Sequence, residues 1–219
     1  MNMQSNALSD GIASANPKQI QFFKAKNRFV AYGGARGGGK SWALQRKITM
    51  MCLRFDGIKV LLLRRTYPEL QENHINTLMS LLKGAAIYKA SEKTFLFANG
   101  SRIKCGYCKA ESDVLQYQGQ EYDIICIDEA TQFTEYQFET LTCLRGANDF
   151  PKRMYLTCNP GGVGHEWVKR LFVSRRYKAS EKPDDYTFIP ATVFDNKILL
   201  EKDPGYVNML NNLSEGLRE

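Results

Sequence analysis

The sequence predicts an α/β fold: a mostly parallel central sheet flanked by helices, plus one antiparallel hairpin. Strand-length apolar runs alternate along the chain with segments of helical periodicity, the order that parallel sheets require. Several of these runs are nearly continuous in apolar residues, as in strands covered on both faces. The Asn99-Gly100 pair within an alternating stretch is a strong hairpin signal.

Each expected element has its own local signal. Trp42, Leu44 and Ile48 recur at helical spacing after the first strand, and Pro68 stands at the first-turn position of the next helix. The expected strands cover residues 28–33, 58–64, 94–98, 101–107, 122–127, 153–158 and 186–190. The expected helices cover residues 41–55, 68–83, 134–144 and 165–173, with a closing helix from about residue 203.

The length of 219 residues suits one domain with its own core. We expect a flexible lead-in at residues 1–16, the folded domain at 17–200, and a closing helix or the start of a linker at 201–219. A net charge of +7 suits a polyanionic partner, although many proteins carry such an excess for solubility alone.

Composition excludes several classes of protein. Hydrophobic residues make up 43% and charged residues 24% of the chain, near globular averages, so a disordered or fibrous chain is not expected. No apolar run has membrane-spanning length, and the polar N-terminus lacks a secretion signal, which favours a cytosolic protein. The six cysteines are expected to be reduced core residues. Cys105 and Cys108 have the spacing of half a zinc site, but no second pair follows, and His74 and His165 are isolated in the sequence.

A glycine-rich loop between the first strand and the first helix fits G-x-x-x-x-G-K-[ST]. It consists of Gly34, Ala35, Arg36, Gly37, Gly38, Gly39, Lys40 and Ser41. The glycines let backbone N–H groups approach phosphates, and the following helix points its positive end at them. Lys40 is expected between the β- and γ-phosphates and Ser41 on Mg²⁺, with Trp42 also in the nucleotide site. This loop predicts a P-loop NTPase; a chance glycine-rich turn is the alternative.

An acidic pair ends the strand at residues 122–127. Asp128 is expected to hold Mg²⁺, most simply through water, and Glu129 to act as the general base on the attacking water. Adjacent acids also occur at ordinary strand ends, so the functional interpretation of this pair depends on the presence of the P-loop. A water-activating glutamate favours hydrolysis of ATP over phosphoryl transfer to another acceptor.

Several segments, in this order, resemble the ATPase domain of the large terminase subunits of tailed bacteriophages or prophages, the DNA-packaging motors. The matching segments are Pro17-Lys18-Gln19, the P-loop with its Arg36, Leu63–Leu70, Ile127–Thr131, Leu156–Gly162 and Ala191–Leu213. The resemblance covers nearly the whole chain from Pro17. It implies an additional-strand ATPase fold related to RecA proteins and helicases, with the strand at 153–158 between the P-loop strand and the acidic strand.

The resemblance also implies roles for single residues. Thr157, Cys158 and Asn159 would form a coupling motif that senses hydrolysis, with Asn159 beside the γ-phosphate. Arg36 would sense or stabilise γ-phosphate charge, and Gln19 would read the adenine edge. Each has a plainer alternative: a strand end before a Pro-Gly turn, a solvated arginine at the loop crest, and a glutamine before a helix.

Two features depart from the family pattern. Some members carry an arginine, proposed to act on a neighbouring subunit's ATP, where this chain has Gln118 before Gly119. Arg145 is only a weak substitute and is more simply a helix-end cation. Large terminases also carry a C-terminal nuclease domain with clustered acids, and no such cluster follows the coupling motif here. We therefore expect an isolated ATPase domain from a longer protein.

A basic run after the coupling motif is the candidate contact with DNA phosphates. It contains Lys169, Arg170, Arg175, Arg176 and Lys178; a solvated helix face is the equal alternative. The resemblance implies double-stranded DNA, a portal protein, a small terminase subunit and a homo-oligomeric ring as partners, in the host cytoplasm. Two other functions stay open: a helicase-like nucleic-acid ATPase, and an assembly module whose turnover needs the ring.

Overall fold

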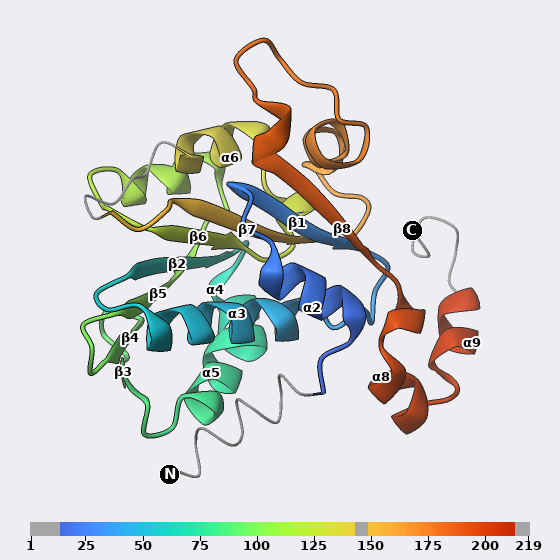
Figure 1. The fold of residues 1–219 in the computed structure, drawn as a ribbon, viewed down its shortest axis with the longest axis horizontal. Helices are drawn as coiled ribbons and strands as arrows, with labels where there is room; N and C mark the ends of the chain where they lie inside the picture. The colour runs from blue at the N-terminus through green and yellow to red at the C-terminus, as the bar shows by residue number, and fades with distance from the viewer. Residues whose placement is uncertain (1–13, 143–148, 213–219) are drawn as a thin grey trace.

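The computed structural model describes residues 14–142 and 149–212, and these form an α/β fold around one eight-stranded sheet (Figure 1). The strand order is β3-β4-β5-β2-β6-β7-β1-β8. The strands are β1 (Phe29–Gly34), β2 (Lys59–Arg64), β3 (Ala86–Lys89), β4 (Thr94–Phe97), β5 (Arg102–Tyr107), β6 (Ile124–Ile127), β7 (Arg153–Cys158) and β8 (Tyr186–Ala191).

The strands from β5 to β8 in this order pair in parallel, and β4 and β3 extend one edge in antiparallel pairing. The prediction of a mostly parallel sheet with an antiparallel part is therefore confirmed. β7 lies between β1 and β6, the place implied for the coupling-motif strand. Because parallel strands end at the same edge of a sheet, the segments after β1, β6 and β7 meet there.

Helices cover both faces of the sheet (Figure 1). They are α2 (Pro17–Lys24), α3 (Lys40–Arg54), α4 (Tyr67–Leu70), α5 (Asn76–Leu81), α6 (Glu135–Thr142), α7 (His165–Val168), α8 (Lys197–Lys202) and α9 (Tyr206–Asn211). Two π-helical turns, η1 (Gln71–Ile75) and η4 (Lys169–Val173), continue α4 and α7. Short 3₁₀ turns occur at η2 (Glu111–Tyr117), η3 (Ala130–Gln132), η5 (Pro183–Asp185) and η6 (Val193–Asp195).

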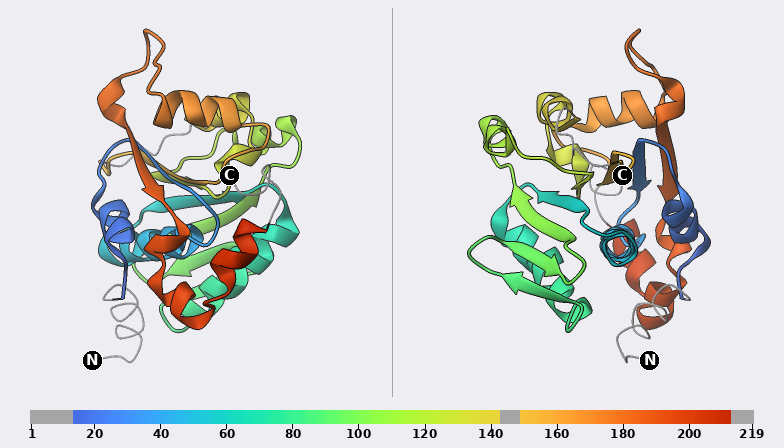
Figure 2. Two further views of the ribbon diagram at one scale, coloured as in Figure 1. Left: turned by 90° about the vertical axis from the view of Figure 1, so that its right-hand side faces the viewer. Right: turned by 60° about the vertical axis from the view of Figure 1, so that its left-hand side comes forward.

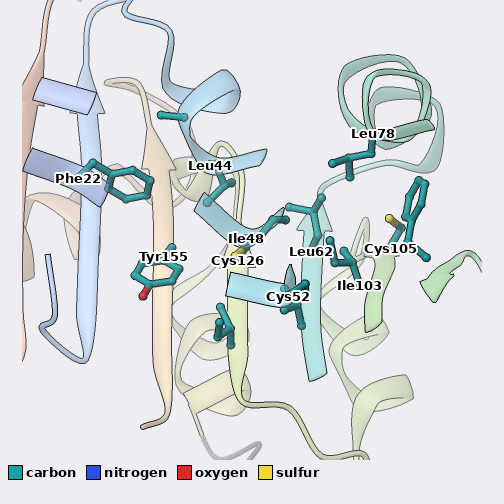
Figure 3. Packing of buried hydrophobic residues seen from close by; sticks show 14 of the residues in the cluster. Phe22, Leu44, Ile48, Cys52, Leu62, Leu78, Ile103, Cys105, Cys126 and Tyr155 are labelled. Atoms are coloured by element: carbon teal, nitrogen blue, oxygen red, sulfur yellow. The ribbon is translucent and has the colours of Figure 1, made fainter. Parts of the chain in front are cut away.

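The alternation of side chains along the strands divides the interior into two cores. In β2, Leu62 belongs to the core that also contains residues of α2, α3 and α5, whereas its neighbour Leu63 belongs to the core on the other face. Figure 3 shows the first core, where Leu44 and Ile48 of α3 lie over the strands. Both faces of the central strands are buried, which explains why their sequences are continuously apolar rather than alternating.

Several elements differ from the sequence prediction, among them α2, which was not in the expected set of helices. The edge strand β3 was not expected, because it is four residues long and only half-buried on alternate positions. The helix expected at 68–83 runs from 67 to 81 and widens into a π-helical turn at η1. The closing helix expected from about residue 203 corresponds to α9, but α8 before it was not expected; the two helices are separated at Asp203–Gly205, where Pro204 interrupts the helical hydrogen bonding. The expected boundary after residue 200 falls within α8.

The cysteines of the described ranges lie inside the protein. Cys52, Cys105, Cys108, Cys126 and Cys158 are buried free thiols, and Cys143 lies outside the described residues. Burial raises the pKa of Cys105 and of Cys108 to about 12, which keeps these thiols protonated. Within the ranges that the structure describes, no helix has the length and apolar character needed to cross a membrane.

Candidate active site

The glycine-rich loop joins β1 directly to α3. Gly34, Gly37 and Gly39 have positive φ angles of 134°, 78° and 71°, which other residues adopt only at a cost. A Cβ at Gly37 would lie 2.8 Å from the ring of Tyr206 in α9, and one at Gly39 would lie 2.6 Å from Gln19 Nε2. The loop needs glycine both for its backbone angles and because α2 and α9 pack against it; Figure 2 shows α9 and the neighbouring α8 from two further directions.

A cavity of about 540 Å³ opens beside this loop. Its lining combines the P-loop with the end of β2 and the segments after β6 and β7: residues 36–42, Arg64, Glu129, Thr131, Gln132 and residues 159–162. A second cavity, of about 280 Å³, is lined by residues near the opposite ends of β1, β6 and β7 and contains none of the expected catalytic residues. The sequence-predicted P-loop, acidic and coupling segments therefore share one cavity.

Asp128 is the centre of a buried polar network. Its carboxylate is 0% exposed and accepts hydrogen bonds at Oδ1 from Ser41 Oγ (2.9 Å) and Thr157 Oγ1 (2.5 Å). Oδ2 accepts from His74 Nε2 (2.9 Å) and from the Arg64 guanidinium. Burial acts to raise the pKa of Asp128, but His74, Arg64 and Thr157 outweigh it and hold the pKa well below its usual range. Asp128 is therefore a carboxylate.

The side-chain oxygens of Ser41 and Asp128 are suitable ligands for a hard divalent cation. Ser41 Oγ lies 2.9 Å from Asp128 Oδ1, and Ser41 lines the cavity. Mg²⁺ prefers such oxygen ligands and retains several waters. Ser41 would offer its hydroxyl to the metal from the cavity wall, and the buried Asp128 would hold that hydroxyl and add its negative charge behind it.

Glu129 projects into the cavity from a left-handed backbone conformation, with φ of 56°. Its N–H donates to Thr157 Oγ1 (3.0 Å), and its Oε1 accepts from Asn159 Nδ2 (2.7 Å). Burial and the charge of Asp128 raise the pKa of Glu129, which brings this carboxylate closer to the basicity of an effective general base. A non-glycine residue with positive φ is uncommon and is retained where surrounding contacts hold it.

The coupling segment bridges the two acids. The Thr157 hydroxyl donates to Asp128 and accepts from the Glu129 N–H, so one buried side chain sets the relative position of both. Asn159 holds Glu129, while its own buried Oδ1 accepts no hydrogen bond from a described residue. Gln132, which the sequence interpretation did not include, lines the same cavity with an equally unpartnered Oε1 among the described residues.

The remaining P-loop side chains differ in their surroundings. Lys40 is 6% exposed and its Nζ donates to Ala35 O at 2.6 Å. Burial lowers the pKa of Lys40, and the negative charges of Glu129 and Asp128 oppose this effect. Arg36 is exposed at the cavity wall, and the Arg46 guanidinium lies 3.9 Å from the ring centre of Trp42. Cys158 is buried against Gly33, where a Cβ would meet its Sγ at 2.2 Å.

Gln19 lies against the P-loop, but its amide already has partners. Its Oε1 accepts from the Asn16 N–H (2.9 Å) in the capping box of α2, and its Nε2 donates to Gly39 O (3.3 Å). The side chain is 6% exposed. In this arrangement Gln19 ties α2 to the phosphate-binding loop.

The basic run divides into paired and exposed residues. Arg170 forms ion pairs with Glu181 and Glu135, and Lys178 pairs with Glu135 and Glu139. Lys169, Arg175 and Arg176 are exposed in the segment that leads into the projecting loop before β8 (Figure 2). Gln118 is exposed before Gly119, and Arg145 lies outside the described residues.

Three residues of the Asp128 network had no assigned role in the sequence. Arg64 was part of a matching segment only, while Gln45 and His74 belong to no motif. His74, isolated in the sequence, lies in contact with Asp128 because α4–α5 packs beside β2 and β6. No periodicity or spacing signals a contact between residues 54 positions apart.

Known proteins with a similar sequence or fold agree with this architecture. The family model of the phage terminase large subunit matches residues 25–216. The large terminase of a thermophilic bacteriophage is similar with a TM-score of 0.73 at 18% identity, over 90% of this chain and 50% of that chain. The chain therefore spans about half the length of that protein. A search of curated protein sequences finds no match.

Two solved single domains are also similar. The ATPase domain of the Thermus phage P74-26 large terminase has a TM-score of 0.61 at 12% identity, over 90% of this chain and 88% of that chain. The N-terminal domain of the DNA packaging ATPase from bacteriophage phi29 has a TM-score of 0.56 at 16% identity, over 81% and 95%. These similarities show the P-loop fold, and the family match extends over most of the sequence. The chain belongs to the phage terminase large subunit family.

Proposed function

We propose that this chain hydrolyses ATP with Mg²⁺ and that the hydrolysis powers translocation of double-stranded DNA into a procapsid. The observation that carries the proposal is the convergence of three segments on one cavity, which the P-loop, Glu129 and Asn159 line while Asp128 and Thr157 lie buried directly behind them. Hydrolysis needs a phosphate cradle, a metal site and a water-activating base within one site, and these residues supply all three.

In the proposed reaction the P-loop amides and Lys40 bind the β- and γ-phosphates of ATP. Lys40 leaves its Ala35 carbonyl partner for the phosphates, which neutralise its charge better than a neutral oxygen. Ser41 and the neighbouring Asp128 would hold Mg²⁺, which would supply electrostatic stabilisation of the phosphate charge. Glu129 takes a proton from the attacking water, and the open acceptors of Asn159 and Gln132 orient that water. Arg36 stabilises the γ-phosphate from the cavity wall.

Relatives with bound nucleotide support this proposal. The large terminase of the thermophilic bacteriophage has been solved with ATP-gamma-S and with ADP, at TM-scores of 0.72 and 0.71 to this chain. The similar P74-26 domain is a terminase ATPase domain, and the similar phi29 domain belongs to a DNA packaging ATPase. By similarity, we propose that this chain also uses ATP and Mg²⁺ and acts in DNA packaging.

The proposed partners follow from the packaging role. They are double-stranded DNA, a portal protein, a small terminase subunit and further copies of the chain in a ring, in the host cytoplasm at the procapsid portal. The net charge of +7 and the exposed Lys169, Arg175 and Arg176 beyond the coupling segment support contact with a polyanion. Movement of Asn159 on loss of the γ-phosphate is the proposed link from hydrolysis to this segment.

Steady-state ATP hydrolysis by the wild type and by Glu129→Gln tests the proposal, with nucleotide binding measured on both proteins. We expect hydrolysis to be lost in the variant while ATP still binds, because the P-loop is untouched. Wild-type hydrolysis that survives in Glu129→Gln contradicts the assignment of the base. Wild-type protein that binds no nucleotide contradicts the function itself.

Ring-dependent turnover is a second candidate, in which a neighbouring subunit would have to act through a residue other than the exposed Gln118 that replaces the trans-acting arginine. In this case the domain binds ATP alone but hydrolyses it only next to another subunit. ATPase rates per subunit at increasing protein concentration separate the two. A constant rate per subunit rejects the ring requirement, and a rising rate supports it.

A further inference from the structure

We propose that His74 is a positioning residue for Asp128, and that Gln45 sets the tautomer in which it acts. His74 would keep the buried carboxylate in the orientation that, together with Ser41, holds Mg²⁺. This inference rests on the proposed function, because it concerns the metal side of the same site.

The contact between His74 and Asp128 is direct and excluded from water. Both side chains are 0% exposed, and His74 Nε2 lies 2.9 Å from Asp128 Oδ2. The opposite oxygen, Oδ1, is the one that Ser41 and Thr157 contact. His74 therefore restrains the carboxylate from the side away from Ser41, so the two contacts together resist its rotation.

The partners of Gln45 determine which ring nitrogen of His74 carries the proton. Gln45 Nε2 lies 2.7 Å from Asn73 O, which can only accept, so this atom must be the amide nitrogen. The same nitrogen lies 3.1 Å from His74 Nδ1 and donates its second hydrogen there. Nδ1 is then unprotonated, and the proton is on Nε2, where it is donated to Asp128.

Helix α3 reaches both oxygens of Asp128 through this arrangement. Ser41 and Gln45 are four residues apart and lie on the same side of the helix. Ser41 contacts Oδ1 itself, and Gln45 reaches Oδ2 through His74. The helix that begins at the phosphate-binding loop thus also aligns the carboxylate that would help to hold the metal.

The π-helical turn η1 presents His74 to the site. Within this turn His74 and Ile75 are both buried, although they are adjacent in sequence. The wider turn lets Ile75 stay in the apolar core while His74 points to Asp128. π-Helical turns inside α-helices frequently occur at functional positions for this reason.

The test compares His74→Met, which removes the donor, with His74→Gln, which keeps an amide N–H at similar reach. Calorimetric titration gives the affinity for ATP-gamma-S with Mg²⁺ and with a chelator in its place. We expect His74→Met to reduce the Mg²⁺-dependent gain in affinity about tenfold or more, as for other residues that orient metal ligands, and to leave the metal-free affinity unchanged. His74→Gln should recover most of the gain. Asn76→Ala, on the exposed side of the same helix, is the control.

Two results overturn the proposal. The first is a folded His74→Met variant whose affinity for ATP-gamma-S rises with Mg²⁺ as much as that of the wild type. The second is a His74→Gln variant that loses as much of this Mg²⁺-dependent gain in affinity as His74→Met does. If circular dichroism shows His74→Met to be unfolded, Gln45→Met is measured instead; it should also lower the gain, and an unchanged gain overturns the proposal. A wild type whose affinity does not depend on Mg²⁺ contradicts the proposed metal site itself, which separates failure of the function from failure of this inference.

Discussion

Charged side chains in two regions of the molecule are stabilised in different ways. Asp128 is fully buried and receives four donors, each from a different segment outside the strand that precedes it. Arg170, in the basic run, has a 24% exposed side chain and pairs with two glutamates at the surface. Water competes for the partners of Arg170 but cannot replace those of Asp128.

This difference shows why loss of a charged side chain has different consequences in the two regions. A buried charge must keep its partners, because an uncompensated charge in the interior is very costly. A surface ion pair contributes little, because solvation replaces it. Residues around Asp128 are therefore expected to be strongly coupled, and residues in the basic run nearly independent.

The largest expected effect is from Asp128→Ala. The substitution leaves the Arg64 guanidinium without its buried partner, so we expect the free energy of unfolding to fall by about 3–5 kcal/mol, with loss of hydrolysis. Urea denaturation and an ATPase assay measure the two effects. Asp128→Asn, which keeps the volume and one acceptor oxygen, should unfold less easily than Asp128→Ala. A change in unfolding free energy under about 1 kcal/mol in Asp128→Ala would remove the contrast between the regions.

Thr157→Val should have the next largest effect. It removes the hydroxyl that joins Asp128 to the Glu129 N–H, leaving a buried donor unpaired at a cost of about 1–3 kcal/mol. We expect kcat to fall at least about tenfold, since a hydrogen bond to a charged group is worth that much. Thr49→Val is the matched control, because Thr49 is buried but its hydroxyl has no partner among the described residues. Equal losses in both variants would contradict the bridging role.

Arg175→Ala with Arg176→Ala tests whether the exposed cations contact DNA. We expect weaker DNA binding and a slope of log affinity against log salt reduced by about 0.9 for each DNA phosphate that the variant no longer neutralises. Nucleotide affinity should not change, because both residues lie outside the nucleotide cavity. Lys178→Ala is the comparison, since its charge is already paired with two glutamates. Equal weakening by Lys178→Ala would show that surface pairing does not matter for DNA contact.

The smallest effect is expected from Arg170→Ala, at about 1 kcal/mol or less of unfolding free energy. The pH dependence of this loss of stability shows whether it comes from the ion pairs of Arg170. The hydrogen bond from Arg170 is the main reason that the pKa of Glu181 is lowered, and the bonds from Lys178 and Arg170 lower the pKa of Glu135 against the opposing effect of burial. A lowered carboxyl pKa adds stability above the unfolded-state pKa and loses it as pH falls through the folded-state pKa. Urea denaturation should therefore show that Arg170→Ala has a lower free energy of unfolding than the wild type at neutral pH. In acid, where the glutamates are protonated, the two proteins should have the same free energy of unfolding.

The sequence predicted the main elements and the motif residues because their signals are local. A P-loop is one continuous segment whose glycines, lysine and serine contact the same ligand, and Gly34 to Ser41 meet that description without any knowledge of tertiary contacts. The buried strands β1, β2, β6 and β7 were equally visible as apolar runs. Edge strand β3 and the break between α8 and α9 were not, because short exposed elements bury too little apolar surface to leave a pattern.

Local sequence patterns are enough to predict the parallel α/β architecture, the phosphate-binding loop, and the acids that follow β6. The side chains that complete the site become visible only once the chain is folded. His74 and Arg64 contact Asp128 from separate segments, and Gln45 contacts His74. Gln19 contacts Gly39. Arg170 forms ion pairs with Glu135 and Glu181. The physical reason is that a local pattern records how one segment buries its own surface. The partners of a buried or paired charge are set by how distant segments pack.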